Sequence, residues 1–156
     1  MRNLLLIMLI FLASCNTGIK NEPKKNQANP RNIKDSIIRI HMKLSAFGVE
    51  SNYVPNIDAD IDFINNSSTC KKSYYNPALK DSLYTLNKDE MKYIAGILND
   101  SILDKLKKEY KAPKSDQPTS TVIITTKMKT YTIVDYGLVG DYPMPELYRI
   151  VYKLGY

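Results

Sequence analysis

The chain has 156 residues, of which 44% are hydrophobic and 24% charged, which suits one globular domain with its own core. Two cysteines exclude a disulfide-rich scaffold. The formal net charge is +6, but Arg2 and residues 16–35 account for four of these charges and leave +2 for residues 36–156. Most of the positive charge therefore lies before residue 36, outside the expected domain, and we expect no nucleic-acid partner.

The first fifteen residues combine one positive charge, an apolar run and a cysteine. Arg2 precedes Leu4 to Ala13, a run that is much shorter than the roughly 20 residues a helix needs to cross a bilayer. Such a run is typical of a cleaved signal peptide. The segment Leu12-Ala13-Ser14-Cys15 resembles the lipobox of bacterial lipoproteins. This resemblance implies cleavage before Cys15, a diacylglycerol on its sulfur and a further acyl chain such as palmitate on the new amino terminus. A signal peptide with an incidental cysteine is the alternative.

The same resemblance divides the chain into a signal peptide over 1–14, a lipidated tether over 15–36 and a single domain over 37–156. Residues 16–35 are rich in Asn, Lys, Pro and Gln and hold only two large aliphatic residues. They bury too little surface to offset the entropy of ordering, so we expect a disordered tether. We expect the lipid on Cys15 to hold the protein at the outer membrane of the cell envelope. Both the periplasmic and the cell-surface face of that membrane are compatible with the sequence.

Two segments near the start of the domain alternate aliphatic and polar residues, as strands buried on one face do. They run from Ile38 to Leu44 and from Ile57 to Phe63. The polar positions are basic or titratable in the first and acidic in the second: Arg39, His41 and Lys43, then Asp58, Asp60 and Asp62. If the two strands pair, these faces neutralise each other.

Helix signals follow a weaker third strand at Ser82 to Leu86. Asn87 and Glu90 have the spacing of a capping box, and the residues after them have helical apolar spacing. Asn99-Asp100-Ser101 predicts a break and the cap of a second short helix, whose apolar residues are Leu103, Leu106 and Tyr110.

The last third of the domain predicts a hairpin and a closing helix. Thr121 to Thr126 and Thr130 to Tyr136 are rich in β-branched and aromatic residues and are separated by a short turn. Pro145 suits the first turn of a helix. The order β-β-β-α-α-β-β-α lacks βαβ alternation, so we predict an α+β fold: an antiparallel sheet of four to five strands packed on one face by two to three helices.

Three features of the domain resemble a family of uncharacterised small bacterial lipoproteins. They are Ser115-Asp116-Gln117-Pro118-Thr119-Ser120 before the hairpin, Val134-Asp135-Tyr136-Gly137 at its end, and the later Pro145 and Leu147. Members usually carry a Cys-Phe-Gly-x-Cys-Pro segment after the first strand, where this chain has Ala46-Phe47-Gly48 and a more distant Pro55 without either cysteine. The resemblance implies the fold and the envelope location, and it implies no activity.

The residues predict no catalytic site, metal site or cofactor. His41 is the only histidine and lies between basic residues. The repeat Asp58-x-Asp60-x-Asp62 lacks both the glycine and the glutamate that a calcium loop needs. For Cys70, a buried unreactive thiol is favoured over a reactive one activated by the neighbouring lysines.

The connection after the hairpin is the one candidate region for binding. Asp135, Tyr136, Asp141 and Tyr142 surround two glycines, Gly137 and Gly140. A structural turn is favoured, with a ligand-binding or partner-binding loop as the alternative. Twelve tyrosines with no tryptophan lean towards recognition, although partly buried tyrosines whose hydroxyls contact water are the favoured alternative. Six of them lie in or near predicted loops and ends: Tyr53, Tyr74, Tyr75, Tyr136, Tyr142 and Tyr156.

Two hypotheses follow from this reading. The first is a non-catalytic module that binds an envelope protein, of the inhibitor or immunity type. The second is a ligand-binding or hydrolytic lipoprotein that uses Asp58, Asp60 or Asp135, and it requires a pocket around carboxylates with perturbed pKa values.

Overall fold

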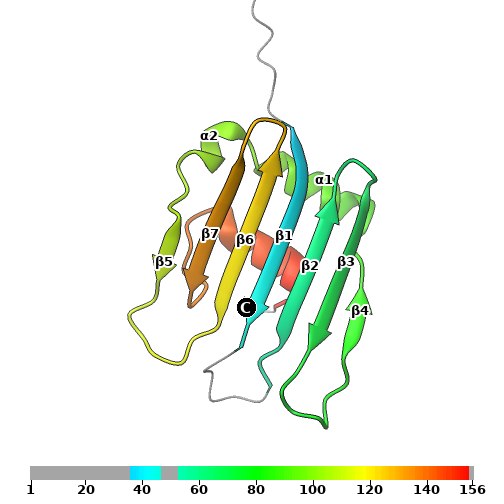
Figure 1. The fold of residues 1–156 in the computed structure, drawn as a ribbon, viewed down its shortest axis with the longest axis vertical. Helices are drawn as coiled ribbons and strands as arrows, with labels where there is room; N and C mark the ends of the chain where they lie inside the picture. Colours follow the sequence, from blue (N-terminus) through cyan, green and yellow to red (C-terminus); the bar gives the residue numbers. More distant parts are fainter. Residues whose placement is uncertain (1–35, 47–52, 155–156) are drawn as a thin grey trace, which may run out of the picture. The chain divides into compact units, whose positions relative to one another are not determined.

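The computed structural model describes residues 36–46 and 53–154, which belong to one compact unit, Lys34–Tyr156. Their central feature is a seven-stranded sheet with the order β4-β3-β2-β1-β6-β7-β5 (Figure 1). All neighbouring strands are antiparallel except β5 and β7, which are parallel. The strands are β1 (Ile37–Ser45), β2 (Asn56–Asp62), β3 (Ser67–Ser73), β4 (Ser82–Tyr84), β5 (Glu109–Lys111), β6 (Thr119–Thr126) and β7 (Thr130–Tyr136).

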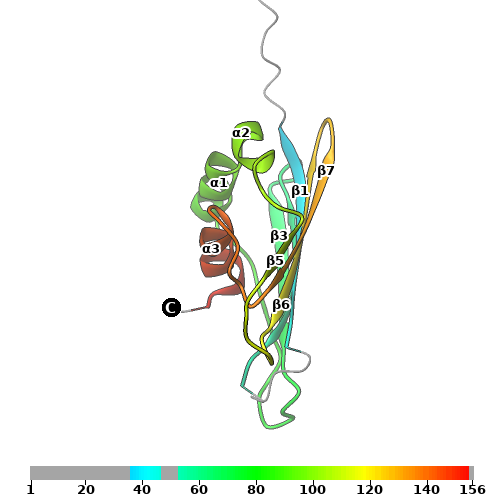
Figure 2. The ribbon, with the colours of Figure 1, turned by 90° about the vertical axis from the view of Figure 1, so that its left-hand side faces the viewer.

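The helical segments lie on one face of this sheet and leave the other face uncovered (Figure 2). They are α1 (Lys88–Ile97), α2 (Asp100–Leu103), α3 (Met144–Leu147) and a π-helical segment η1 (Tyr148–Tyr152) that continues α3. None of the helices in this described part of the chain is long and apolar enough to cross a lipid bilayer. The core therefore forms a single layer between sheet and helices.

Strand alternation explains which side chains fill that layer. Every second residue of the central strands points towards the helices, and most of those residues are aliphatic or sulfur-containing, with Ser120 and Thr126 of β6 as polar exceptions. The fully buried ones include Ile40, Met42, Leu44, Ile57, Ala59, Ile61, Cys70, Val122 and Ile124. The helices contribute the opposite side of the core with Met91, Ile94, Leu103, Met144, Leu147 and Val151. The remaining alternate residues of the strands face the uncovered side.

The predicted starts of the helices are confirmed in atomic detail. The backbone N–H of Glu90 donates to the side chain of Asn87 at 2.9 Å, and the N–H of Asn87 donates to the carboxylate of Glu90 at 2.8 Å. This is the reciprocal capping box that the sequence predicts for α1. Pro145 lies in the first turn of α3, also as predicted. The hairpin of β6 and β7 is confirmed as well.

The α+β class is confirmed, but the prediction of four to five antiparallel strands is wrong. The sheet is mixed and has seven strands. The two strands that the sequence did not predict are β3 and β5. β3 has no large aliphatic residue, and only Cys70 is buried in it. β5 contains Tyr110, which the spacing assigned to a second helix, whereas α2 ends at Leu103. Tyr110 is instead buried from a strand that pairs with β7.

Candidate functional site

The uncovered face of the sheet brings a basic strand beside an acidic one. The register of β1 and β2 sets three basic or titratable residues opposite three aspartates: Arg39 and Asp62, His41 and Asp60, Lys43 and Asp58. On the other side of β2, Lys71 of β3 lies opposite Asp58. The predicted neutralisation of the two strands by each other is therefore confirmed.

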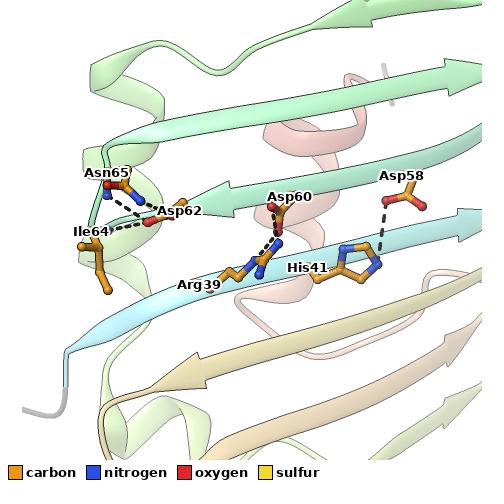
Figure 3. A network of polar contacts seen from close by, with 7 residues as sticks. All are labelled: Arg39, His41, Asp58, Asp60, Asp62, Ile64 and Asn65. Atoms are coloured by element: carbon orange, nitrogen blue, oxygen red, sulfur yellow. Dashed lines mark hydrogen bonds and ion pairs between the residues drawn. The ribbon is translucent and has the colours of Figure 1, made fainter.

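The ion pairs on this face run diagonally, because each basic residue contacts the aspartate two residues away from its register partner (Figure 3). Arg39 donates from Nε and from one terminal nitrogen to the two carboxylate oxygens of Asp60, each at 2.6 Å. This hydrogen bonding raises the pKa of the Arg39 guanidinium. His41 Nε2 lies 3.8 Å from Asp58 Oδ1. Two of the three aspartates are thus already engaged by β1.

The third aspartate of β2, Asp62, stabilises the turn that follows the strand. The N–H groups of Ile64 and Asn65 donate to Asp62 Oδ1 at 2.8 and 2.9 Å, and the Asn65 side chain donates to Oδ2 at 2.7 Å (Figure 3). The hydrogen bonds from the backbone and side chain of Asn65 lower the pKa of Asp62. Asp62 therefore closes the connection between β2 and β3 rather than facing a ligand.

The other half of the uncovered face has little charge. The residues of β6 and β7 that face this side are mostly threonines, with two aliphatic side chains among them: Thr119, Thr121, Ile123, Thr125, Thr130, Thr132 and Val134. At the β5 edge of the same face lies an open hollow of about 710 Å³, whose lining includes Lys111, Pro113, Val134 and Tyr136. The face therefore combines a charged half, an uncharged half and a hollow at one edge.

The predicted binding loop after β7 is organised around a buried carboxylate. Asp135 has no exposed surface, and it accepts hydrogen bonds from the N–H groups of Val139 and Gly140 at 2.9 and 2.7 Å. A Cβ on Gly140 would lie 2.7 Å from the Asp135 carboxylate, so only glycine permits this close approach. Gly137 has a φ of +90°, which also favours glycine. The two glycines thus shape the loop, as the sequence predicted.

The four predicted site residues of this loop do not share one surface. Asp135 is fully buried and Tyr136 is half-buried in the hollow of the uncovered face. Asp141 is exposed and lies 3.7 Å from Lys107, and Tyr142 is 57% exposed. In this arrangement Asp135 is a positioning residue, whereas Tyr136, Asp141 and Tyr142 are accessible to a partner.

A polar cluster inside the core was missed by the sequence analysis. The Tyr148 hydroxyl donates to Asp135 at 2.7 Å, and the Tyr152 hydroxyl and Ser120 Oγ are 2.8 Å apart. The two tyrosine rings stack with centroids 5.5 Å apart. Burial raises the pKa of both tyrosines, so they stay protonated and able to donate. The sequence contains a signal for this cluster, because Tyr148 and Tyr152 lie four residues apart and so share a face of the closing helix beside its apolar positions.

Cys70 is the buried thiol that the sequence analysis favoured. Its side chain points from β3 into the core and has no exposed surface. Burial raises the pKa of the Cys70 thiol to about 11, despite the nearby Lys153. Of the two lysines that follow it in sequence, β3 directs Lys71 to the opposite face, and the ammonium of Lys72 lies over the ring of Tyr74.

Within the described ranges, no group of three or more His, Cys, Asp or Glu side chains is placed to hold a metal ion. Several of the tyrosines that favoured recognition are exposed, namely Tyr53, Tyr75 and Tyr142. The predictions for Cys15, the tether, Phe47, Gly48 and Tyr156 concern residues outside those ranges.

Comparisons with known proteins add no relative. No family model matches the chain, and no curated protein or solved structure is similar to it. Functional inference therefore depends on the residues and their geometry.

Proposed function

We propose that this chain is a lipid-anchored protein of the bacterial cell envelope, whose domain binds another protein as an inhibitor or immunity-type factor. The lipobox-like segment Leu12-Ala13-Ser14-Cys15 supports the anchor. The observation that carries the binding role is the uncovered face of the sheet, a broad polar surface on the side opposite the helices.

The side chains of this face are suited to contact a folded protein. The bidentate pair with Asp60 fixes the long side chain of Arg39 before any partner arrives, which lowers the entropy cost of binding. The half that contains Ile123 and Val134 exposes aliphatic surface among threonine hydroxyls. The hollow beside Tyr136 has room for a protruding partner side chain.

The alternative, a hydrolytic or ligand-binding site built on aspartates, has weaker support. Asp58 and Asp60 lie on an open sheet face in ion pairs with β1. Asp135 is fully buried, and backbone amides and Tyr148 occupy its oxygens. A general acid or base must reach its substrate, which the enclosed Asp135 cannot do, and Asp58 and Asp60 are held in ion pairs on an open face.

The anchor is tested by comparing the full chain with a Cys15→Ser variant in a bacterial host. We expect the full chain to incorporate labelled fatty acid and to sediment with membranes, and the variant to lose both properties. Normal processing and membrane association of Cys15→Ser would contradict the lipid anchor.

The binding role is tested by in-cell crosslinking and affinity capture of the lipidated chain, followed by mass spectrometry. Two arginine substitutions are compared: Val134→Arg on the uncovered face, and Tyr93→Arg as a matched control on the exposed side of α1, where Tyr93 is 47% exposed. We expect one protein in near-equal amount with the wild type and the control, and its loss with Val134→Arg. Recovery of abundant porins and lipoproteins alone, or equal recovery with both variants, would count against the proposal.

A further inference from the structure

The chain enters the domain at the end of the sheet where two hairpin turns meet. β1 begins there, between the turn that joins β6 to β7 and the turn that joins β2 to β3, and α2 lies at the same end (Figure 1). The N–H of Lys127 donates to the carbonyl of Ser36 at 3.1 Å, and the N–H of Phe63 donates to the carbonyl of Ile38 at 3.0 Å. Both turns are therefore hydrogen-bonded to the first residues of the domain.

The apex of each turn carries a large apolar side chain in solvent. Ile64 is 72% exposed and Met128 is 76% exposed. Both turns are held by side-chain caps: Asp62 accepts from the N–H of Ile64, and Thr126 Oγ1 accepts from the N–H groups of Met128 and Lys129 at 3.3 and 3.0 Å. The exposed apolar groups are thus presented by well-defined turns (Figure 3 for Ile64).

Lysines surround the Met128 apex. Lys127 and Lys129 flank it, and Lys129 binds Asp104 at 2.5 Å, which brings the segment after α2 and its exposed Lys105 to the same end. We call Ile64, Lys105, Lys127, Met128 and Lys129 the anchor-side tip. Apolar side chains among lysines are the combination that favours the interface of an anionic membrane, where the chain atoms enter the head-group region and the ammonium groups meet phosphates.

The path of the chain decides which surface the anchor-side tip meets. Twenty residues, 16–35, separate Cys15 from Ser36, so the first residue of the described domain lies at most about 75 Å from the lipidated residue even when this segment is fully extended. An anchor at this distance keeps the tip at a high effective concentration near the bilayer, so a weak contact is enough to orient the domain. The opposite end of the sheet is farther along the strands from the point of attachment (Figure 1).

We propose that the anchor-side tip rests on the anionic lipid surface, with Ile64 and Met128 inserted among the head groups and Lys105 and Lys127 on lipid phosphates, while Lys129 stays paired with Asp104. This inference rests on the proposed lipid anchor at Cys15. It orients the strands away from the membrane and leaves the uncovered face of the sheet directed sideways, accessible to a neighbouring envelope protein.

The test uses the full lipidated chain in vesicles of phosphatidylethanolamine and phosphatidylglycerol. A polarity-sensitive nitrobenzoxadiazole probe is attached in Met128→Cys and, as the matched control, in Tyr75→Cys. Tyr75 is 58% exposed in the segment after β3, at the opposite end of the sheet (Figure 1). Native Cys70 is fully buried and does not compete for the probe. We expect a severalfold rise and a blue shift of emission for the probe at 128 on reconstitution, protection from aqueous iodide, and no change at 75.

A second substitution checks that the two turns act together. Adding Ile64→Asp to the labelled Met128→Cys chain is expected to remove most of the emission change, whereas Leu83→Asp, on the equally exposed Leu83 of β4, is expected to leave it. Vesicle flotation separates the two proposals. Floating protein with an unchanged probe at 128, or with equal changes at 128 and 75, overturns the tip contact and leaves the anchor intact. Protein that does not float overturns both.

Discussion

The two faces of the sheet are built from the same strands but differ in how their polar side chains are paired and exposed to water. On the covered face, the few polar side chains are fully enclosed and hydrogen-bonded to one another, as with Asp135 and Tyr148. On the uncovered face, many charged side chains pair across strands in contact with water, as with Arg39 and Asp60. A hydrogen bond made in the core is costly to break because water cannot replace it, whereas an exposed ion pair is weak. We therefore expect polar groups of the covered face to contribute more to stability than those of the uncovered face.

The largest expected contrast between the faces is in thiol accessibility. In a Cys15→Ser background, native Cys70 should react with a thiol reagent at least about 10³-fold more slowly than a Thr69→Cys thiol, since Cys70 reacts only when the domain opens. Thr69 is the adjacent residue and faces the uncovered side opposite Asp60. The control chain carries Cys70→Ala with Thr69→Cys. Comparable rates at the two positions would contradict the buried geometry of β3.

The raised pKa of Cys70 also predicts that the protein loses stability in alkali. Its pKa is raised from 9.0 to about 11 in the folded state, so the unfolded chain loses the thiol proton first as the pH rises. The free energy of unfolding should therefore fall between pH 9 and 11 through this group, and Cys70→Ala should show a smaller fall over that window. Urea unfolding at several pH values measures both slopes. Identical slopes in the two chains would show that this thiol titrates freely in the native state.

A next, smaller effect is expected from Asp135. Asp135→Ala leaves two backbone N–H groups and the Tyr148 hydroxyl without their acceptor inside the core, which should lower the free energy of unfolding by about 3 kcal/mol. Chemical denaturation followed by circular dichroism gives the value. Asp141→Ala, in the same loop but exposed, is the control and should be close to neutral. A neutral Asp135→Ala would mean that the enclosed cluster contributes nothing to stability.

The next smaller effect is expected from the cap of α1. Asn87→Ala removes the side-chain acceptor for the N–H of Glu90 and should cost about 1 kcal/mol. Partial burial by itself raises the pKa of Glu90, but the hydrogen bonds from Lys153 and from the Asn87 backbone outweigh it and lower the pKa overall. The contribution of Glu90 is therefore present at neutral pH and lost as the pH falls through its lowered pKa. Glu90→Gln should weaken this acid dependence, which urea unfolding at descending pH measures.

The smallest change is expected on the uncovered face. Arg39→Gln and Asp60→Asn each disrupt an exposed pair, and each should reduce stability by less than Asn87→Ala does. A double-mutant cycle measured at low and at high salt should give a coupling that fades with salt. A coupling as large as the effect of Asp135→Ala, or one insensitive to salt, would remove the contrast between the two faces.

The sequence predicts the central strands well because their signals are local. β1 and β2 alternate strictly, and their polar positions have opposite charge, which fixes both the pairing and the face. β3 has no such pattern, because six of its seven residues are Ser, Thr or Lys, and it forms a strand through pairing with β2 and β4. Tyr110 has helical spacing from Leu103 and Leu106, and only the parallel contact with β7 places it in a strand. Pairing between distant segments decided both cases.

The candidate loop shows a similar division. The glycines around Asp135 predict a turn, and Gly140 is required by the approach of the carboxylate. The burial of Asp135 was not predictable from these residues, because it depends on Tyr148 in the next element and on the register of β7 beside β6. Exposure of Tyr142 follows from the loop, whereas the hollow beside Tyr136 depends on β5, which the sequence did not reveal.

The position of β1 in the sheet has a consequence for how the chain matures. β1 is the first strand of the described residues, yet one of its two neighbours is β6, which is separated from it by β2 to β5 and two helices. A chain that emerges from its amino terminus can form the β1–β2–β3 meander early, but one edge of β1 stays open until Thr119–Thr126 has emerged, and the apolar side of the meander is fully covered only when α3 and η1 have followed. Completion of the domain therefore waits for the last quarter of the chain, and any factor that shields the nascent protein must remain until then.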